Sequence, residues 1–368
     1  MPSLFDLDPA TAEETLGARY RVKQLFEGLF EKALPVTEIT NLPLRLRAQL
    51  DNDYPLSLSE VTMTTSDDMA TRKWLYEIDG GYRIETVLME YPHRATACIS
   101  TQAGCAMACS FCATGQGGFG RQLTTAEIVE QVYRAKQAAL PRRLSNIVMM
   151  GMGEPLANYR SLMGALRVIV DRFGISPRRI TVSTVGVVPG IKRLATEGLP
   201  LTLAVSLHAA NDHDRSEIIP LNRRYPIEQI VASCEEWTAA TSRLVSLEWA
   251  MIADFNDTQR AADELGTIAR RLRAHVNLIP LNPTPGYLVR GSTRDRVLAF
   301  QRTLQANDVR CTIRSTRGQT IDAACGQLAM RTEPMTIRRR SNPRLTACTT
   351  SSNEDRSQPI ERQQGVSR

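Results

Sequence analysis

Apolar residues recur at helical spacing near the start of the chain and at strand spacing further along. Between Val22 and Phe30 apolar side chains lie three and four positions apart, so we predict amphipathic helices over residues 10–53. Residues 73–90 contain two alternating runs around Asp79-Gly80-Gly81, a pattern that predicts a β-hairpin. Helices followed by a hairpin therefore precede the rest of the chain.

After the hairpin, short apolar runs alternate with helical patterns. The predicted strands are residues 96–101, 146–151, 179–184, 201–208, 245–252, 275–281 and 310–315, and the predicted helices are residues 124–140, 159–173, 189–198, 227–241, 258–274 and 293–307. Thr124 and Thr125, followed by Glu127, form a helix-start signal. Such a long strand–helix alternation predicts an α/β fold, with a parallel sheet or barrel and helices outside it.

The pattern stops near residue 333, and this divides the chain into three parts. We predict an accessory segment of helices and hairpin over residues 1–88, an α/β core over residues 89–332, and a disordered polar tail over residues 333–368. The tail is rich in Pro, Ser and Arg and has no apolar periodicity.

Composition narrows the class of protein. The 368 residues are 42% hydrophobic, enough for a large core, and the acidic start lacks the pattern of a signal peptide. No apolar run is long enough to span a bilayer, so we expect a cytoplasmic protein, without a membrane partner. The net charge of +6 favours a polyanionic partner, although many proteins carry such a charge by chance.

Three cysteines lie within eight residues, at Cys105, Cys109 and Cys112, directly after the first strand of the alternating region. Reduced thiols clustered in this way indicate a metal site or catalysis more often than disulfides. A structural zinc site needs four ligands, and the fourth would have to be Cys98, inside a strand, or His93. Three thiolates without a neighbouring fourth instead suit an iron–sulfur cluster with one open iron.

The spacing Cys-x3-Cys-x2-Cys, with Phe111 before the last cysteine, resembles the radical S-adenosylmethionine (SAM) enzymes from about Cys98 to Leu328. The resemblance implies a partial parallel β/α barrel of roughly six strands and one [4Fe-4S] cluster held by the three cysteines. It also implies that SAM binds the open iron and is cleaved to a 5′-deoxyadenosyl radical.

Polar residues follow several of the predicted strands. In "MMGMGEPL", Gly151 and Gly153 would let the backbone approach a ligand, and Glu154 can accept hydrogen bonds from an ammonium group. Taken alone, each such residue is more often a turn or capping residue, but their recurrence at successive strand ends favours a ligand inside the barrel. The predicted SAM contacts are Gly153, Glu154, Ser183, Ser206, Leu207, His208 and Asn282.

Longer motifs sharpen the resemblance. "RATACISTQAGCAMACSFCATG", "MGMGEPL", "VSLHA", "PLNPTP" and "IDAACGQL" together resemble the rRNA adenine-C2 methyltransferase family called RlmN, from about Leu16 to Leu328. The family's substrate is an adenosine of 23S rRNA at the peptidyl transferase centre, and for some members also the tRNA adenosine just 3′ of the anticodon.

The family chemistry assigns roles to further residues. One SAM methylates the thiolate that matches Cys325, and a second SAM supplies the radical that removes hydrogen from this methyl group. The carbon radical then adds to C2, and the thiol that matches Cys98 forms a disulfide with Cys325 and releases the product. The resemblance points to Glu85 as the acceptor of the C2 proton, although a solvent-facing strand glutamate fits the sequence equally well.

The resemblance also implies partners, namely 23S rRNA, tRNA and an electron donor such as ferredoxin or flavodoxin, with the chain acting as a monomer. Two alternatives stay open. A related family methylates adenine C8 with the same cluster and cysteine pair, and the chain could instead be a zinc-stabilised RNA-binding protein without catalysis. The predicted contact with RNA would come mainly from Arg and Lys, with the target base flipped into the barrel mouth.

Overall fold

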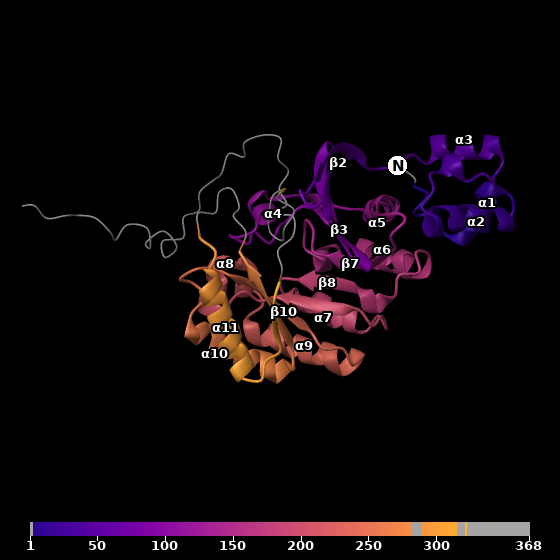
Figure 1. The fold of residues 1–368 in the computed structure, drawn as a ribbon. Coiled ribbons are helices and arrows are strands. Elements are labelled where there is room, and N and C mark those ends of the chain that lie inside the picture. Colours follow the sequence, from indigo (N-terminus) through magenta and orange to yellow (C-terminus); the bar gives the residue numbers. More distant parts are fainter. Residues whose placement is uncertain (1–2, 282–288, 315–320, 322–368) are drawn as a thin grey trace, which may run out of the picture. The chain divides into compact units, whose positions relative to one another are not determined.

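The computed structural model describes residues 3–281, 289–314 and 321. In this part of the chain ten strands form one sheet in the order β1-β2-β3-β4-β7-β8-β9-β10-β11-β12 (Figure 1). The seven strands from β4 to β12 in this order are mutually parallel, and all seven predicted strands are among them. The α/β fold with a mostly parallel sheet is thus confirmed, with β12 added beyond the six strands that the resemblance implied.

The parallel strands are short. Their bounds are β4 (Arg94–Cys98), β7 (Leu144–Met149), β8 (Ile180–Thr184), β9 (Thr202–Ser206), β10 (Ser246–Met251), β11 (His275–Pro280) and β12 (Cys311–Ile313). The predicted helices that connect them are also present: α5 (Thr125–Ala139), α6 (Tyr159–Asp171), α7 (Val188–Ala195), α9 (Ile227–Thr241), α10 (Gln259–Leu272) and α11 (Arg294–Ala306). The Thr124 hydroxyl accepts from Glu127 N at 3.2 Å, and the Glu127 carboxylate accepts from Thr124 N, so the start signal forms a complete capping box.

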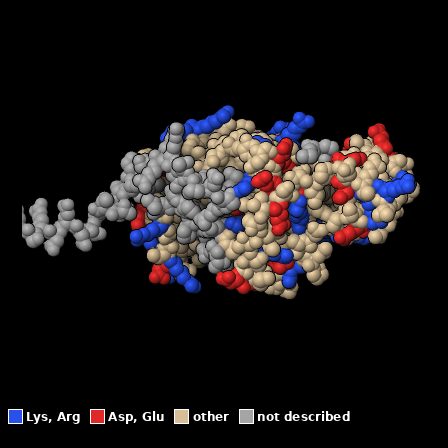
Figure 2. Space-filling model, turned by 90° about the horizontal axis from the view of Figure 1, so that it is seen from above, with Lys and Arg blue, Asp and Glu red and all other residues tan. Residues whose placement is uncertain are grey.

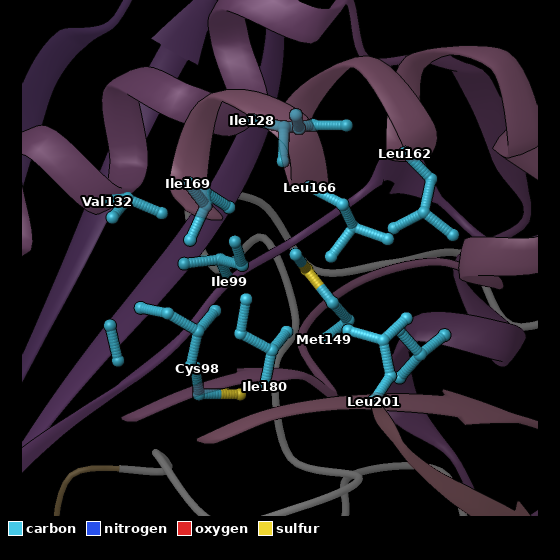
Figure 3. Close-up of a cluster of buried hydrophobic side chains, with 14 of the residues drawn as sticks. Cys98, Ile99, Ile128, Val132, Met149, Leu162, Leu166, Ile169, Ile180 and Leu201 are labelled. Atoms are coloured by element: carbon cyan, nitrogen blue, oxygen red, sulfur yellow. The ribbon is translucent and has the colours of Figure 1, made fainter. Parts of the chain in front are cut away.

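The register divides each parallel strand into an apolar outer face and a more polar inner face. Ile147 pairs with Ile180, and Val182 pairs with Leu203, and these side chains are fully buried on the outer face. Figure 3 shows sheet residues such as Met149 and Ile180 facing α5 and α6 residues such as Ile128. The outer face therefore holds the core, which leaves the inner face for polar groups.

Antiparallel strands extend the sheet before the parallel part. The predicted hairpin is confirmed as β2 (Thr71–Ile78) and β3 (Tyr82–Tyr91), joined by the predicted turn at residues 79–81, and β3 pairs with β4. Strand β1 (Ser59–Thr65) adds to β2 and was not predicted. The predicted boundary at residue 88 falls inside β3 and remains a prediction.

The amino-terminal segment forms the predicted helices and packs on α5 and on the residues that follow α6. It contains α1 (Pro9–Leu16), α2 (Arg19–Phe26), a π-helical turn (Glu27–Glu31) and α3 (Leu44–Asp53). The Lys136 ammonium donates to Phe30 O at 2.6 Å, and the Phe30 ring lies 5.1 Å from the Phe173 ring. Among the described residues, no helix is both long and apolar enough to cross a membrane.

Candidate active site

A small second sheet fixes the cysteine loop. Strands β5 (Gln102–Gly104) and β6 (Phe119–Gln122) pair on either side of the three cysteines, and the short helix α4 (Ala113–Gln116) begins just after Cys112. Cys105 N donates to Gly118 O at 2.7 Å, which ties the start of the loop to its end. Gly104 has a φ of +76°, and a Cβ there would lie only 2.1 Å from Gly118 O. Glycine is therefore required at position 104.

One cavity of about 1070 Å³, including its open mouth, lies at the carboxyl edge of the parallel strands. All three cysteines line it, together with residues at or just after the ends of the six strands β7 to β12. Of the predicted SAM contacts, Gly153, Glu154, Ser183, Ser206 and His208 line the cavity. The structure thus brings these residues together with the thiols in one ligand-sized site, where parallel α/β folds carry their chemistry.

The donor set suits the predicted cluster. Three thiols come from one loop, are half-buried, and lie close enough to interact electrostatically with one another. Burial raises the pKa of the Cys105 thiol to about 12 and holds that of Cys109 well above its usual value, so iron would have to displace these protons on binding. Among the described residues, no three His, Cys, Asp or Glu side chains are placed to hold a single metal ion.

Glu154 is held rigidly at the cavity wall. Its two carboxylate oxygens accept from Leu156 N at 3.1 Å and from Val185 N at 2.9 Å, and the carboxylate is also hydrogen-bonded by the Thr184 side chain. These three bonds leave part of its acceptor capacity unused. Burial raises the pKa of Glu154 to about 7. The carboxylate is thus positioned to receive a ligand's ammonium group, which would favour its charged form.

Close packing inside the protein is a further reason for the two glycines before Glu154, Gly151 and Gly153. A Cβ on Gly153 would lie 2.6 Å from the Gln102 Cβ, and one on Gly151 would lie 2.7 Å from Ile99 C. Their missing side chains therefore make room for residues 99–102 of the chain itself, and the approach of a ligand to their backbone remains a prediction. This close packing brings β5 and the cysteine loop against the end of β7.

His208 is buried in the neutral form. Its Nδ1 accepts from Ala250 N at 2.9 Å, so the proton is on Nε2, and its φ of +59° is unusual for a residue other than glycine. Burial, and next the charge of Arg215, lower its pKa to about 3. The ring, edge-on to Phe111 with centroids 4.7 Å apart, is suited to donate a hydrogen bond rather than to act as a base.

Of the other predicted SAM contacts, the two serines line the cavity and Leu207 does not. The Ser183 hydroxyl donates to Met149 O at 3.1 Å and lines the cavity together with Ser206. Leu207 does not line the cavity, because its side chain lies in the hydrophobic core. Asn282 lies outside the described residues.

Of the three predicted catalytic residues, Cys98 and Glu85 are described, and neither is among the residues that line the cavity. Cys98, 7% exposed, ends β4 and pairs with Val148, which places it on the inner face that also carries Ser183. Glu85 lies on the neighbouring strand β3, on the same face as Cys98 by register, and it is buried and ion-paired with Lys73 at 3.5 Å. A solvent-facing Glu85 is therefore wrong. Cys325 lies outside the described residues.

Two buried charged residues at this site were not predicted. Arg215, in α8 (Asp212–Ile218), is fully buried and donates to backbone oxygens of the β8 and β9 ends. Glu248, on β10, is buried and lines the cavity. A charged residue inside an apolar strand run was the available signal for Glu248, because burying a charge is costly without a purpose.

Comparisons with known proteins agree with this geometry. Residues 99–263 match the radical SAM superfamily. A probable dual-specificity RNA methyltransferase RlmN from Salinispora tropica is 48% identical over 324 residues, covering 84% of this chain and 87% of the relative. A protein of the same name from Mycolicibacterium paratuberculosis is 48% identical over 343 residues, covering 89% of this chain and 94% of the relative.

A solved structure gives the same result. The crystal structure of a radical SAM methyltransferase from Sphaerobacter thermophilus superposes with a TM-score of 0.86 at 45% identity, covering 89% of this chain and 99% of that one. The chain therefore belongs to the radical SAM superfamily and, within it, to the RlmN family.

Proposed function

We propose that the chain is an RNA methyltransferase that places a methyl group on C2 of an adenosine in 23S rRNA, and on the adenosine 3′ of the tRNA anticodon. The observation that carries this proposal is the cavity at the strand ends, lined by three thiols, Glu154 and His208. The names of the relatives support RNA as the substrate. The position on the base rests on the family resemblance.

The cavity residues divide into two sets. Cys105, Cys109 and Cys112 would hold a [4Fe-4S] cluster, and Glu154, Ser183, Ser206 and His208 would hold SAM beside it. When bound, the pair supplies a carbon radical at the adenosyl 5′ position. Glu154 would bind and orient the ammonium group of SAM, because its oxygens are fixed by backbone donors yet retain acceptor capacity.

The three predicted catalytic residues would carry the methyl group, release the product and accept a proton. In the proposed sequence, the Cys325 thiol carries the methyl group, Cys98 resolves the protein–RNA thioether by forming a disulfide, and Glu85 accepts the C2 proton. The placement of Cys98 and Glu85 on adjacent strands, on one face of the sheet, supports a shared site. The Lys73 ammonium lies 3.5 Å from the Glu85 carboxylate, so the side chain of Glu85 is held by an ion pair.

The charge distribution gives no separate argument for an RNA surface. On the face shown in Figure 2, basic and acidic side chains are interspersed. The proposal that RNA binds therefore rests on the family and the cavity. The electron donor, the monomeric state and the cytoplasmic location remain predictions.

Anaerobic reconstitution followed by turnover on rRNA and tRNA fragments tests the proposal. We expect about four irons per chain, consumption of two SAM molecules per methyl group transferred, and a methyl group on adenine C2 by mass spectrometry of the digested RNA. A methyl group on C8 would overturn the regiochemistry. Stoichiometric zinc without iron would indicate an RNA-binding protein instead.

Replacing the resolving thiol tests the covalent route. Cys98→Ala is expected to leave the protein covalently joined to RNA, because the bond from Cys325 to the methylated base can no longer be broken by disulfide formation. Gel mobility of the protein before and after nuclease treatment measures this product. Cys234→Ala, at a buried cysteine on α9, is the control and should release free product. Normal release of product by Cys98→Ala would remove Cys98 from the mechanism.

A further inference from the structure

The carboxylate of Glu248 is an unexplained charge in the cavity wall. Glu248 is 4% exposed and lies on the inner face of β10, where it pairs by register with Ser206 on β9 and Asn277 on β11. No ion pair neutralises it among the described residues. A buried carboxylate without a cation is costly, so its presence calls for a role.

Both hydrogen bonds that the Glu248 side chain accepts go to the same carboxylate oxygen. Its Oε1 accepts from the Ser246 hydroxyl at 3.0 Å and from Asn277 Nδ2 at 3.0 Å. Asn277 is itself fixed, because its Oδ1 accepts from the Thr312 hydroxyl at 2.7 Å. The second oxygen, Oε2, is buried and receives no donor from the described residues. The protein thus fixes the carboxylate and leaves one oxygen with unused acceptor capacity.

A ligand of the cavity would supply the missing donor. A metal ion does not suit the position, because the neighbours of Glu248 on the two paired strands are a serine and an asparagine rather than further carboxylates, imidazoles or thiols. A nucleoside suits it, because ribose hydroxyls and the exocyclic amine of adenine are neutral donors that a carboxylate accepts strongly. Both proposed substrates contain an adenosine.

We propose that Glu248 is a positioning residue whose Oε2 accepts a hydrogen bond from the adenosine moiety of a substrate bound in the cavity. This inference rests on the proposed methyl transfer and deepens it. The donor belongs either to SAM or to the target adenosine of the RNA, and the measurements below distinguish the two.

Glu248→Gln is the test, measured in the anaerobically reconstituted enzyme. Glutamine keeps the shape and an acceptor for Ser246 and Asn277, but it presents an amide donor where Oε2 stood. We expect about a tenfold or larger loss of affinity for the substrate that supplies the donor. A raised Kd for SAM in equilibrium dialysis identifies SAM, whereas an unchanged Kd with a raised KM for the RNA fragment identifies the target adenosine.

Glu130→Gln is the matched control. Glu130 is also fully buried, but its carboxylate accepts from Ser57 N at 2.7 Å and from Arg134 Nε at 2.8 Å, and it does not line the cavity. We expect this change to lower the melting temperature while leaving the Kd for SAM and the KM for RNA unchanged. Glu248→Gln should instead raise the Kd for SAM or the KM for RNA while leaving the melting temperature nearly unchanged.

The outcomes separate this inference from the proposed function. If wild-type enzyme binds no SAM and methylates no RNA, the proposed function fails. If wild type is active and both constants of Glu248→Gln stay within about twofold of wild type, the role of Glu248 is wrong. It is also wrong if Glu248→Gln does not fold, because the carboxylate would then be part of the structural core.

Discussion

The Gly104→Ala variant is expected to lose iron binding and RNA methylation while it keeps most of its secondary structure. A Cβ at residue 104 would stand 2.1 Å from Gly118 O, the oxygen that accepts from Cys105 N. Gly118 O is a backbone atom, and the position of a Cβ is fixed by its own backbone, so neither can rotate away as the end of a long side chain would. Relief of the clash must therefore separate β5 from β6 and displace Cys105 from the cavity.

The left-handed backbone adds to this cost. Gly104 has a φ of +76°, which an alanine adopts at about 1–2 kcal/mol, and the overpacking adds about 1–3 kcal/mol. The iron content after anaerobic reconstitution and the far-ultraviolet circular dichroism spectrum measure the two parts of the prediction. An iron content equal to that of wild type would contradict it.

Gly118→Ala is the matched control, because it lies in the same loop and has nearly the same backbone. Its φ is +79°, but a Cβ there would meet no atom within 4 Å. It should therefore pay only the conformational cost of about 1–2 kcal/mol and still bind iron. A comparable loss of iron in both variants would show that backbone strain, rather than the clash with Gly118 O, is responsible.

The core elements could be predicted because their outer faces are apolar at a regular period. Every predicted helix and strand of the α/β region is present, since each must bury one side against its neighbours. Strand β1 was missed because most of its residues are exposed, so no alternation marks it. Strands β5 and β6 were missed because they are only three and four residues long.

The sequence indicated which residues could form the site, but it did not indicate which of their side chains are buried and what they contact. The three cysteines and five of the seven predicted SAM contacts line one cavity, while their roles remain predictions. The burial of Glu85 could not be predicted, because it depends on strand pairing and on Lys73 from another strand. Leu207 lies within a motif whose neighbours line the cavity, yet its side chain alternates into the core.

Arg215 illustrates what a single sequence conceals, since its partners are backbone atoms of distant segments. Its guanidinium donates to Val185 O at 2.6 Å, to Leu207 O at 3.0 Å and to Ser206 O at 3.2 Å. It also donates to the Asn222 side chain at 2.9 Å. Burial lowers the pKa of Arg215 to about 10, so the group stays charged at neutral pH and holds the ends of β8 and β9 together.

Arg215→Met is accordingly expected to lower the free energy of unfolding by about 3–5 kcal/mol. Methionine fills much of the space but removes a donor from four buried acceptors. Leu207 O still accepts from Ala209 N, and each acceptor left without any donor costs about 1–3 kcal/mol. The total is less than the sum, because the variant no longer has to bury a charge. Arg215 holds the end of β9, where the predicted SAM contacts Ser206 and His208 lie. The folded fraction of the variant should therefore also bind SAM more weakly. Chemical denaturation of the iron-free protein measures the first effect, and equilibrium dialysis of the reconstituted protein measures the second.

Arg271→Met is the control for the loss of an arginine. Arg271 is exposed and ion-paired with Glu228 and Glu235, both at 2.8 Å, so its replacement should cost less than about 1 kcal/mol. Arg215→Lys separates charge from geometry, because lysine keeps the charge but cannot reach four acceptors in fixed directions. It should recover only a small part of the lost stability. Equal unfolding midpoints for Arg215→Met and Arg271→Met would show that the buried guanidinium does not hold the strand ends, and the geometry of the cavity wall would then need another cause.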